Sequence, residues 1–210
     1  MESIPLRSIV NGREVSLNFE EDTGSTSKHI QQSYQLHDAV RNKQLINIPI
    51  GLDITLIDER NQTCLDIALE NGDEAAVKIL LDHQDWEKIM RRRESHTDNS
   101  PMQMVIKKMP NLVEYVFNKC VDKQDDITTY NYEFLDDMYV LPSEIAIHMV
   151  SSKKGTATPY YATGKLRDEA IIRSSNFDTI IKSHPLTLMV EAKLYDLLSH
   201  PLLVFFTLVL

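Results

Sequence analysis

The chain has 210 residues, 22 basic against 31 acidic side chains, a formal net charge of -9 and a hydrophobic fraction of 42%. These are ordinary globular values, so they exclude wholesale disorder, and the excess of acidic side chains argues against a broad positive surface for nucleic acid. Two cysteines cannot make a disulfide framework, and no CxxC pair indicates a zinc site. The first residues lack the apolar core of a signal peptide, which makes a cytosolic protein the default.

An internal repeat organises the first half of the chain. The segment from Thr63 to Gly72 follows the Thr-Pro-Leu-His-x-Ala signature of ankyrin repeats, in which a helix is followed by a glycine turn and a second helix. Val77, Leu80 and Leu81 then share one face of the expected second helix. This segment therefore predicts one ankyrin-type helix pair.

Weaker copies of the signature flank this one, at Leu36–Val40 and at Ser100–Val105. Leu65 follows Leu36 by 29 residues and Met102 follows Leu65 by 37, which lie on either side of the ankyrin period of about 33 residues. Three copies are near the minimum for a stable stack, so we interpret them as the end of a longer one. The residues expected to carry the ankyrin fold are Leu36, His37, Ala39, Thr63, Leu65, Ala68 and Gly72.

The pattern changes after about residue 120. Asp122–Asp126 is a polar break, and Thr129–Phe134 then alternates with period two, which predicts a half-buried strand. Ser151–Pro159 has the composition of a flexible loop. A helix is predicted to begin near Ser183 and to end or kink at Pro201. Its apolar stripe consists of Leu186, Met189, Val190, Leu194, Leu197 and Leu198.

The sequence thus predicts a mainly α protein, built from the end of an ankyrin-repeat solenoid, a small α+β linker module and a C-terminal amphipathic and then apolar helix. The expected parts are an irregular segment over residues 1–33, about three repeats over 34–120, the strand-containing linker over 121–182 and the helical end over 183–210.

The residues Leu202–Leu210 carry no charge. A helix of this length covers about 14 Å, whereas the hydrocarbon core of a bilayer is about 30 Å thick. The segment cannot span a membrane by itself. It is either the first half of a spanning helix or an apolar helix packed on the domain, and the sequence leaves both interpretations open.

In chain order these features resemble the cytosolic part of transient receptor potential ankyrin (TRPA) channels, just before the membrane domain. The matching blocks include Cys64–Ala68, Ser100–Met102 and Tyr130–Leu135. The most specific block is Leu194–Leu202, which contains the run Leu-Leu-Ser-His-Pro-Leu. The resemblance covers roughly residues 55–202.

The resemblance implies a tetrameric, non-selective, calcium-permeable cation channel of the plasma membrane. This segment would lie on the cytosolic side and couple chemical or thermal stimuli to the pore. The resemblance also implies a homotetramer in the full-length channel, a membrane contact through the C-terminal end, and no cofactor. The residues assigned to the coupling helix are Leu194, Leu197, Leu198, His200 and Pro201.

In such channels a few cysteines after the last repeats react with electrophiles. Only Cys120 keeps its thiol here, because Ile89 and Ser100 occupy the other two positions. The lysine expected near Val204 and the Lys-Trp pair expected after it are absent. Cys120 is therefore the electrophile-sensing candidate, and the alternative is a half-buried structural cysteine at a helix end.

Arg91, Arg92 and Arg93 form a basic run that either contacts an anionic ligand, such as a phosphoinositide or polyphosphate, or belongs to a solvated loop. The main alternative function is a soluble ankyrin-repeat scaffold that binds protein partners on the ankyrin surface and stays in the cytosol. No HExxH, GxSxG or P-loop motif occurs, so we expect no catalytic residue, no metal site and no enzyme activity.

Overall fold

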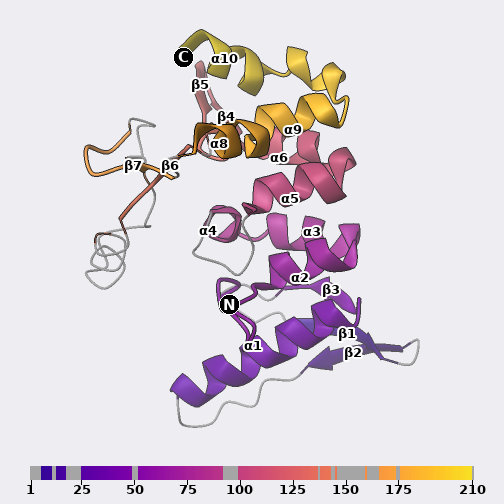
Figure 1. Ribbon diagram of the computed structural model, residues 1–210. Helices are drawn as coiled ribbons and strands as arrows, with labels where there is room; N and C mark the ends of the chain where they lie inside the picture. The colour runs from indigo at the N-terminus through magenta and orange to yellow at the C-terminus, as the bar shows by residue number, and fades with distance from the viewer. Residues whose placement is uncertain are drawn as a thin grey trace. The chain divides into compact units, whose positions relative to one another are not determined.

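The computed structural model is organised as two compact units, Met1–Pro101 and Met102–Leu210. Each unit has its own helices and its own antiparallel strands, which Figure 1 labels in chain order. The structure describes residues 6–10, 13–17, 25–48, 52–91, 99–136, 138–142, 145, 159, 166–173 and 176–209.

The first unit begins with strands and a long helix. Strand β1 (Leu6–Val10) pairs antiparallel with β2 (Arg13–Leu17) on one side and with β3 (Leu45–Asn47) on the other. Helix α1 (Ser25–Arg41) lies between β2 and β3 in the chain. The expectation of an irregular segment over residues 1–33 is therefore wrong where the structure describes it, since neither the hairpin nor the start of α1 has a strong local signal.

A pair of helices follows, α2 (Cys64–Asn71) and α3 (Glu74–Leu81), and the short α4 (Trp86–Met90) comes after them. Helix α1 packs on α2, and α2 packs on α3. The faces that meet are apolar, which is what the helical spacing of the sequence predicted. The buried residues of this core are Leu36, Val40, Leu65, Ala68, Leu69, Ala76, Val77, Leu80 and Leu81.

Local side-chain chemistry sets where α2 and α3 begin. The Thr63 hydroxyl accepts a hydrogen bond from the backbone N–H of Asp66, and the Asp66 carboxylate accepts one from the backbone N–H of Thr63. This reciprocal capping box satisfies N–H groups that a helix start leaves unpaired. In the same way, the Asp73 carboxylate accepts a hydrogen bond from the backbone N–H of Ala76 at the start of α3.

Gly72 ends α2 in the left-handed conformation, with φ of 64°. Its backbone N–H closes the helix on the carbonyls of Ala68 and Leu69. A side chain added at Gly72 would meet no atom within 4 Å, so any penalty comes from the backbone conformation alone.

Replacing Gly72 with alanine is therefore expected to lower the free energy of unfolding by about 1–2 kcal/mol, the cost of holding an L-residue in the left-handed region. Urea denaturation followed through the fluorescence of Trp86 would measure the change in the first unit. Gly72→Asn is the matched control, because asparagine tolerates this conformation better than alanine does. Equal stability of the alanine variant and the parent would contradict this interpretation of the turn.

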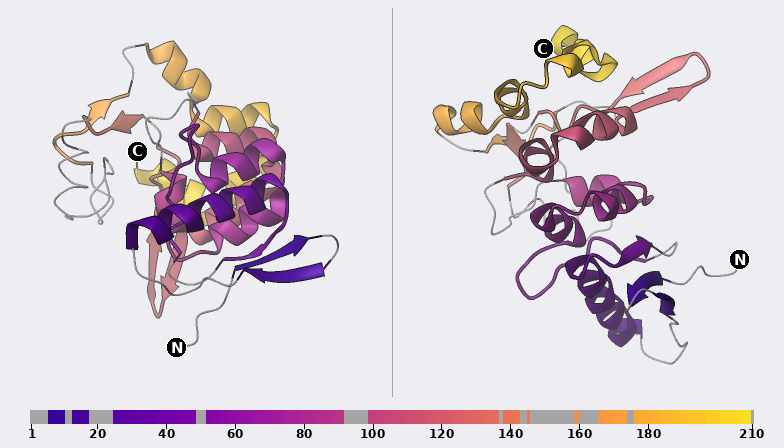
Figure 2. Two further views of the ribbon diagram at one scale, coloured as in Figure 1. Left: turned by 90° about the horizontal axis from the view of Figure 1, so that it is seen from below. Right: turned by 90° about the vertical axis from the view of Figure 1, so that its right-hand side faces the viewer.

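The second unit starts with another helix pair. Helix α5 (Pro101–Lys108), the 3-10 turn η1 (Pro110–Leu112) and α6 (Val113–Lys119) lead directly into the hairpin of β4 (Val121–Gln124) and β5 (Ile127–Tyr130). Figure 2 shows this hairpin as a two-stranded projection from the helices. The mainly helical fold class with small antiparallel sheets is confirmed, while the stacking of the helix pairs into an ankyrin solenoid stays a prediction.

The rest of the unit consists of short elements. Strands β6 (Tyr139–Val140) and β7 (Ile171–Ile172) pair antiparallel. The helical end follows with α8 (Phe177–Ser183), α9 (Pro185–Glu191), the 3-10 helix η2 (Tyr195–Ser199) and α10 (Pro201–Val209).

Two local predictions for this unit need correction. The segment expected to be a polar break, Asp122–Asp126, contains most of β4 and the turn of the hairpin. The expected strand Thr129–Phe134 ends at Tyr130, and a turn begins at Glu133. Antiparallel pairing with a polar partner strand, which alternation within one segment cannot reveal, sets these boundaries. Of the expected loop Ser151–Pro159, residues 151–158 lie outside the described residues.

The predicted helix near Ser183 is confirmed at its start and wrong at its end. Helix α9 begins at Pro185 but stops at Glu191, and Lys193 adopts a positive φ of 57°. Pro201 does not end a helix but begins α10, a position that suits proline because it has no N–H to leave unpaired. The expected single helix is thus three short pieces.

Candidate functional site

The contacts between α6 and α10 centre on His200. Its imidazole Nδ1 accepts a hydrogen bond from the backbone N–H of Leu202 at 3.2 Å, and its Nε2 lies 3.2 Å from the side-chain oxygen Oδ1 of Asn118. The ring centroid lies 5.4 Å from that of Phe117. We call these residues (Phe117, Asn118, His200 and Leu202) the α6–α10 joint.

These two hydrogen bonds fix the state of the ring. Since Nδ1 accepts a hydrogen bond from a backbone N–H, it carries no hydrogen of its own, so Nε2 carries the ring hydrogen and donates a hydrogen bond to Asn118 Oδ1. Burial lowers the pKa of His200, and the carboxylate of Glu114 opposes that shift. The neutral ring with its hydrogen on Nε2 is therefore the form that satisfies both contacts.

Aromatic pairs extend the contact of α10 to the residues of the hairpin and beyond. The ring of Phe205 stacks on that of Tyr130 with 4.3 Å between centroids, and the ring of Phe206 lies 5.6 Å from that of Tyr132. Such pairs add to the free energy gained by burying their surface. Helix α10 therefore contacts α6 through His200, and its Phe205 and Phe206 contact Tyr130 and Tyr132 at and after the end of β5.

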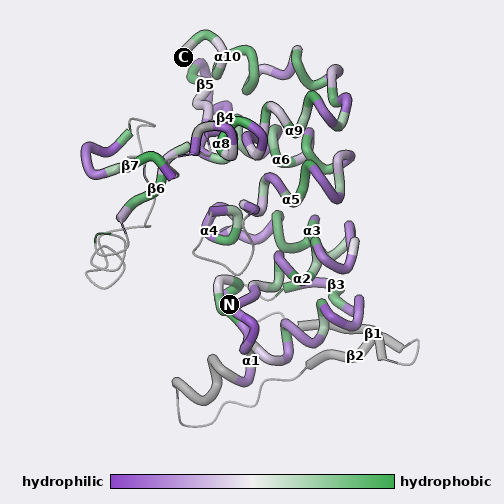
Figure 3. The backbone as a smooth tube through the Cα atoms, viewed as in Figure 1, coloured by the Kyte–Doolittle hydropathy of each residue, from purple (hydrophilic) through white to green (hydrophobic). Residues whose placement is uncertain are grey.

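The apolar C-terminal segment is buried on one face only. Leu202, Leu203 and Phe206 are buried, whereas Leu208 is 78% exposed. Figure 3 shows α10 as hydrophobic over most of its length. Across the described residues we find no helix with both the length and the apolar character that crossing a bilayer requires.

A second histidine–proline cap precedes the joint. His184 Nδ1 accepts a hydrogen bond from the backbone N–H of Leu186 at 3.2 Å, just as His200 does for α10, and Pro185 takes the first helical position. The neighbouring Ser183 carbonyl accepts a hydrogen bond from Gln103 Nε2 at 2.6 Å, which ties α8 to α5. The sequence predicted the helix boundaries at His184-Pro185 and His200-Pro201. It did not reveal the contact of His200 with Asn118 or that of Ser183 with Gln103, because no local pattern links residues about 80 positions apart.

The predicted coupling residues do not form one helix face. Leu194, Leu197 and Leu198 lie after the end of α9, and Leu198 is exposed. Leu194 and Leu198 line a small apolar cavity of about 220 Å³ together with Leu186, Met189, Val190, Tyr195, Leu203 and Thr207. Of the predicted coupling residues, His200 contacts α6 through Asn118, and Pro201 begins α10.

Both thiols are buried. Cys120 follows α6 and is 3% exposed, and burial raises the pKa of Cys64 in α2. Electrophiles need an accessible thiolate, so this environment does not favour the proposed reaction at Cys120. The alternative of a structural cysteine at a helix end agrees better with its position.

We therefore expect iodoacetamide at neutral pH to leave both thiols of the folded chain unmodified and to label both in urea. Mass spectrometry of the intact chain would count the labels, and Cys64→Ser and Cys120→Ser variants would assign them. Labelling of Cys120 in the folded chain at the rate of the unfolded chain would restore it as a reactive site.

The basic run is described only at its first residue. Arg91 donates to the Glu87 carboxylate at 3.3 Å, so its guanidinium already has an anionic partner within the chain. Arg92 and Arg93 lie outside the described residues. The anionic-ligand site stays a prediction.

The residues of the ankyrin signature have structural positions. His37 in α1 places Nε2 3.1 Å from the carbonyl oxygen of Gln62 and so connects α1 to the segment just before α2. Thr63 and Gly72 delimit α2 as described above. Leu36, Ala39, Leu65 and Ala68 are buried.

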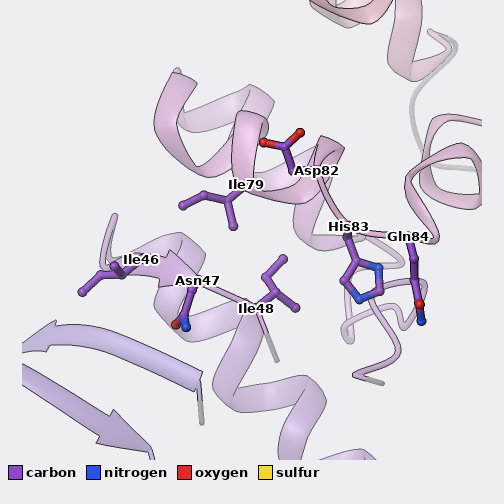
Figure 4. Close-up of a pocket in the computed structure, with 7 residues that line it drawn as sticks. All are labelled: Ile46, Asn47, Ile48, Ile79, Asp82, His83 and Gln84. Atoms are coloured by element: carbon purple, nitrogen blue, oxygen red, sulfur yellow. The ribbon is translucent and has the colours of Figure 1, made fainter. Parts of the chain in front are cut away.

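The first unit also has a cavity of about 470 Å³ beside β3 and α3, drawn in Figure 4. His83 in its wall is 5% exposed at the side chain, and its Nδ1 accepts a hydrogen bond from the backbone N–H of Asp85 at 3.1 Å. Its Nε2 is buried and has no hydrogen-bond partner among the described residues. No group of His, Cys, Asp and Glu that could hold a metal ion occurs in the part of the chain that the structure describes.

Comparison with known proteins gives one informative similarity. The chain is 30% identical over 169 residues to the transient receptor potential cation channel subfamily A member 1 homolog of Caenorhabditis elegans. The match covers 72% of this chain. The chain is thus similar to part of a TRPA-type channel. It spans 14% of that relative's length. No protein-family model matches the chain.

Proposed function

We propose that this chain is a cytosolic coupling segment of a TRPA-like, calcium-permeable, non-selective cation channel. The 30% identity to the nematode channel homolog over 169 residues carries the proposal. The chain corresponds to a small share of that relative, so conduction would belong to a larger protein of which this segment is a part. In that protein the segment would lie on the cytosolic face of the plasma membrane, within a homotetramer.

The segment would act by mechanical transmission. A stimulus that moves α6 would move the Asn118 side chain, which is bonded to His200 at the start of α10. The stacked pair of Tyr130 and Phe205 offers a second route from the hairpin to the same helix. Transmission of this kind requires that the joint has two conformations and that the stimulus changes their relative free energy. The contacts of His200 and the aromatic pairs are the elements that would change between them.

A soluble ankyrin-repeat scaffold that binds protein partners is the second candidate. The capped pair of α2 and α3, with its glycine turn, favours it, because most ankyrin repeats serve as binding surfaces. The contacts of α10 with the hairpin and of His200 with α6 favour the channel, because a binding scaffold needs no additional strands and helices packed after its repeats.

Two experiments separate these candidates. Long-read sequencing of the transcript is expected to reveal further hydrophobic helices encoded after Leu210 if the chain belongs to a channel. The nematode homolog with its matching segment replaced by this chain is then expected to give calcium signals on heating or chemical stimulation. A verified stop codon at Leu210, together with a chimera that reaches the cell surface and stays silent, would favour the scaffold.

A further inference from the structure

His200 makes one contact with each ring nitrogen, and the contact that caps α10 requires Nδ1 to be unprotonated. Its Nδ1 caps the first turn of α10 by accepting the Leu202 N–H, while its Nε2 bonds to Asn118 on α6. A proton added to Nδ1 would remove the acceptor and leave the Leu202 N–H without its cap, although Nε2 could still donate to Asn118. The imidazole thus caps α10 and bonds to α6 at the same time only when it is neutral.

A protonated ring would also carry its charge at an unfavourable place. The N-terminus of a helix carries the positive end of the helix dipole, so a cation at the capping position is repelled. The apolar residues Leu202 and Leu203 follow immediately and are buried, so water cannot easily reach the freed N–H. Protonation therefore removes one favourable contact and adds an unfavourable one at the same end of α10.

We propose that His200 is a pH-sensitive latch, whose protonation releases the start of α10 from the α6–α10 joint. The proton comes from the solvent and binds Nδ1, and no other bond changes. The meaning of this release for channel gating rests on the proposed function. The latch itself is a property of the second unit alone.

The charged groups around the ring leave the pKa of His200 below its ordinary value. Burial lowers the pKa of His200, and the Glu114 carboxylate on α6 partly opposes this effect. Asn118 is uncharged, and the ammonium group of Lys119 lies over the ring of Tyr115, 5.8 Å from its centroid. In η2, the side chain of Asp196 is exposed to solvent. No group named here pairs with the imidazolium strongly enough to reverse the effect of burial.

The direction of the pH effect follows from this lowered pKa. The released ring takes up a proton more readily than the docked ring, so lowering the pH favours release. The full stability of the joint is present above the ordinary histidine pKa of about 6.5. It falls as the pH drops from there to the pKa of the docked ring, and it levels off below that value.

Amide hydrogen exchange on the 210-residue chain tests the latch without any channel, so its failure is distinguishable from failure of the channel proposal. From pH 7.5 to pH 5 we expect the protection factors of Leu202–Val204, corrected for intrinsic exchange, to fall about 5- to 10-fold, the factor for loss of one helix cap. The protection of α6 at Val116 and Phe117 is expected to stay constant. Nitrogen chemical shifts of the imidazole are expected to show the ring hydrogen on Nε2 at pH 7.5.

Two substitutions sharpen this test. His200→Asn keeps a side chain that caps a helix well but cannot titrate, so its α10 protection should not change over this pH range. Asn118→Asp places a carboxylate beside Nε2 and favours the charged form of the docked ring, which brings its pKa closer to that of the released ring, so the loss of α10 protection at low pH should shrink or vanish. His184→Asn, at the equivalent cap of α9, is the matched control and should leave the response of α10 as in the parent.

The proposal is overturned if the parent and His200→Asn lose the same protection between pH 7.5 and 5, or if the ring hydrogen is found on Nδ1. If His200→Asn already lacks amide protection in α10 at pH 7.5, the pH dependence of protection in Asn118→Asp becomes the test of the latch. A loss of α10 protection that is as large in that variant as in the parent then rejects the latch.

Discussion

Replacing Phe206 with alanine is expected to lower the free energy of unfolding of the second unit by about 3–5 kcal/mol, the usual cost of removing a buried phenylalanine ring. Phe206 is 2% exposed and pairs with Tyr132, so its removal leaves a cavity under α10 that the short helix cannot easily close. Because the single tryptophan lies in the first unit, amide exchange at Val116 in α6 would report this change.

The matched control for this substitution is Leu208→Ala, two residues further along the same helix. Leu208 is exposed, and its truncation is expected to change the free energy of unfolding by no more than about 0.5 kcal/mol. A loss of less than about 1 kcal/mol in Phe206→Ala would mean that α10 is not seated on the hairpin as described.

The second large effect is expected in the first unit. Leu65→Ala should lower its free energy of unfolding by about 2–5 kcal/mol, because Leu65 is fully buried in α2, which packs against both α1 and α3. Trp86 in α4 provides the fluorescence signal, and urea denaturation the measurement.

The control for Leu65 is Ile57→Ala, at an isoleucine that is 49% exposed, with an expected change within about 0.5 kcal/mol. Similar losses in the two variants would show that Leu65 has no special place in the core. That result would remove the structural basis of the ankyrin-type signature in this unit.

The elements with strong local signals could be predicted from the sequence. The pair α2 and α3 was expected because the segment from Thr63 to Gly72 follows the ankyrin signature and the apolar residues after it follow the helical period, and the structure adds the cap that Thr63 and Asp66 form. The start of α9 could be predicted because a proline at the first helical position follows a residue that can cap. These signals act within a few residues and do not depend on the rest of the fold.

The α6–α10 joint could not be predicted in the same way. His200 and Asn118 are 82 positions apart, and neither has a neighbouring residue that indicates its partner. The resemblance to TRPA channels pointed to the region around His200 and Pro201 but assigned the coupling to one continuous helix. The positive φ of Lys193 interrupts that helix, and nothing in the apolar spacing of Leu194, Leu197 and Leu198 indicates the break.

Burial also changes the interpretation of the cysteines. In the sequence Cys120 kept the thiol of a reactive position, beside the cation of Lys119. In the structure it is packed at the end of α6, next to the start of β4. Exposure depends on long-range packing, so sequence alone could not separate a reactive thiol from a structural one.

In the proposed function, movements of α6 and of the end of β5 displace α10 through the contacts of its buried face. The most direct measurement is the calcium signal of the nematode chimera carrying Phe206→Ala or Leu208→Ala, compared at equal surface expression. We expect Phe206→Ala to reduce the stimulus-evoked signal strongly and Leu208→Ala to leave it unchanged. Equal signals from both variants and the parent chimera would contradict the proposed function.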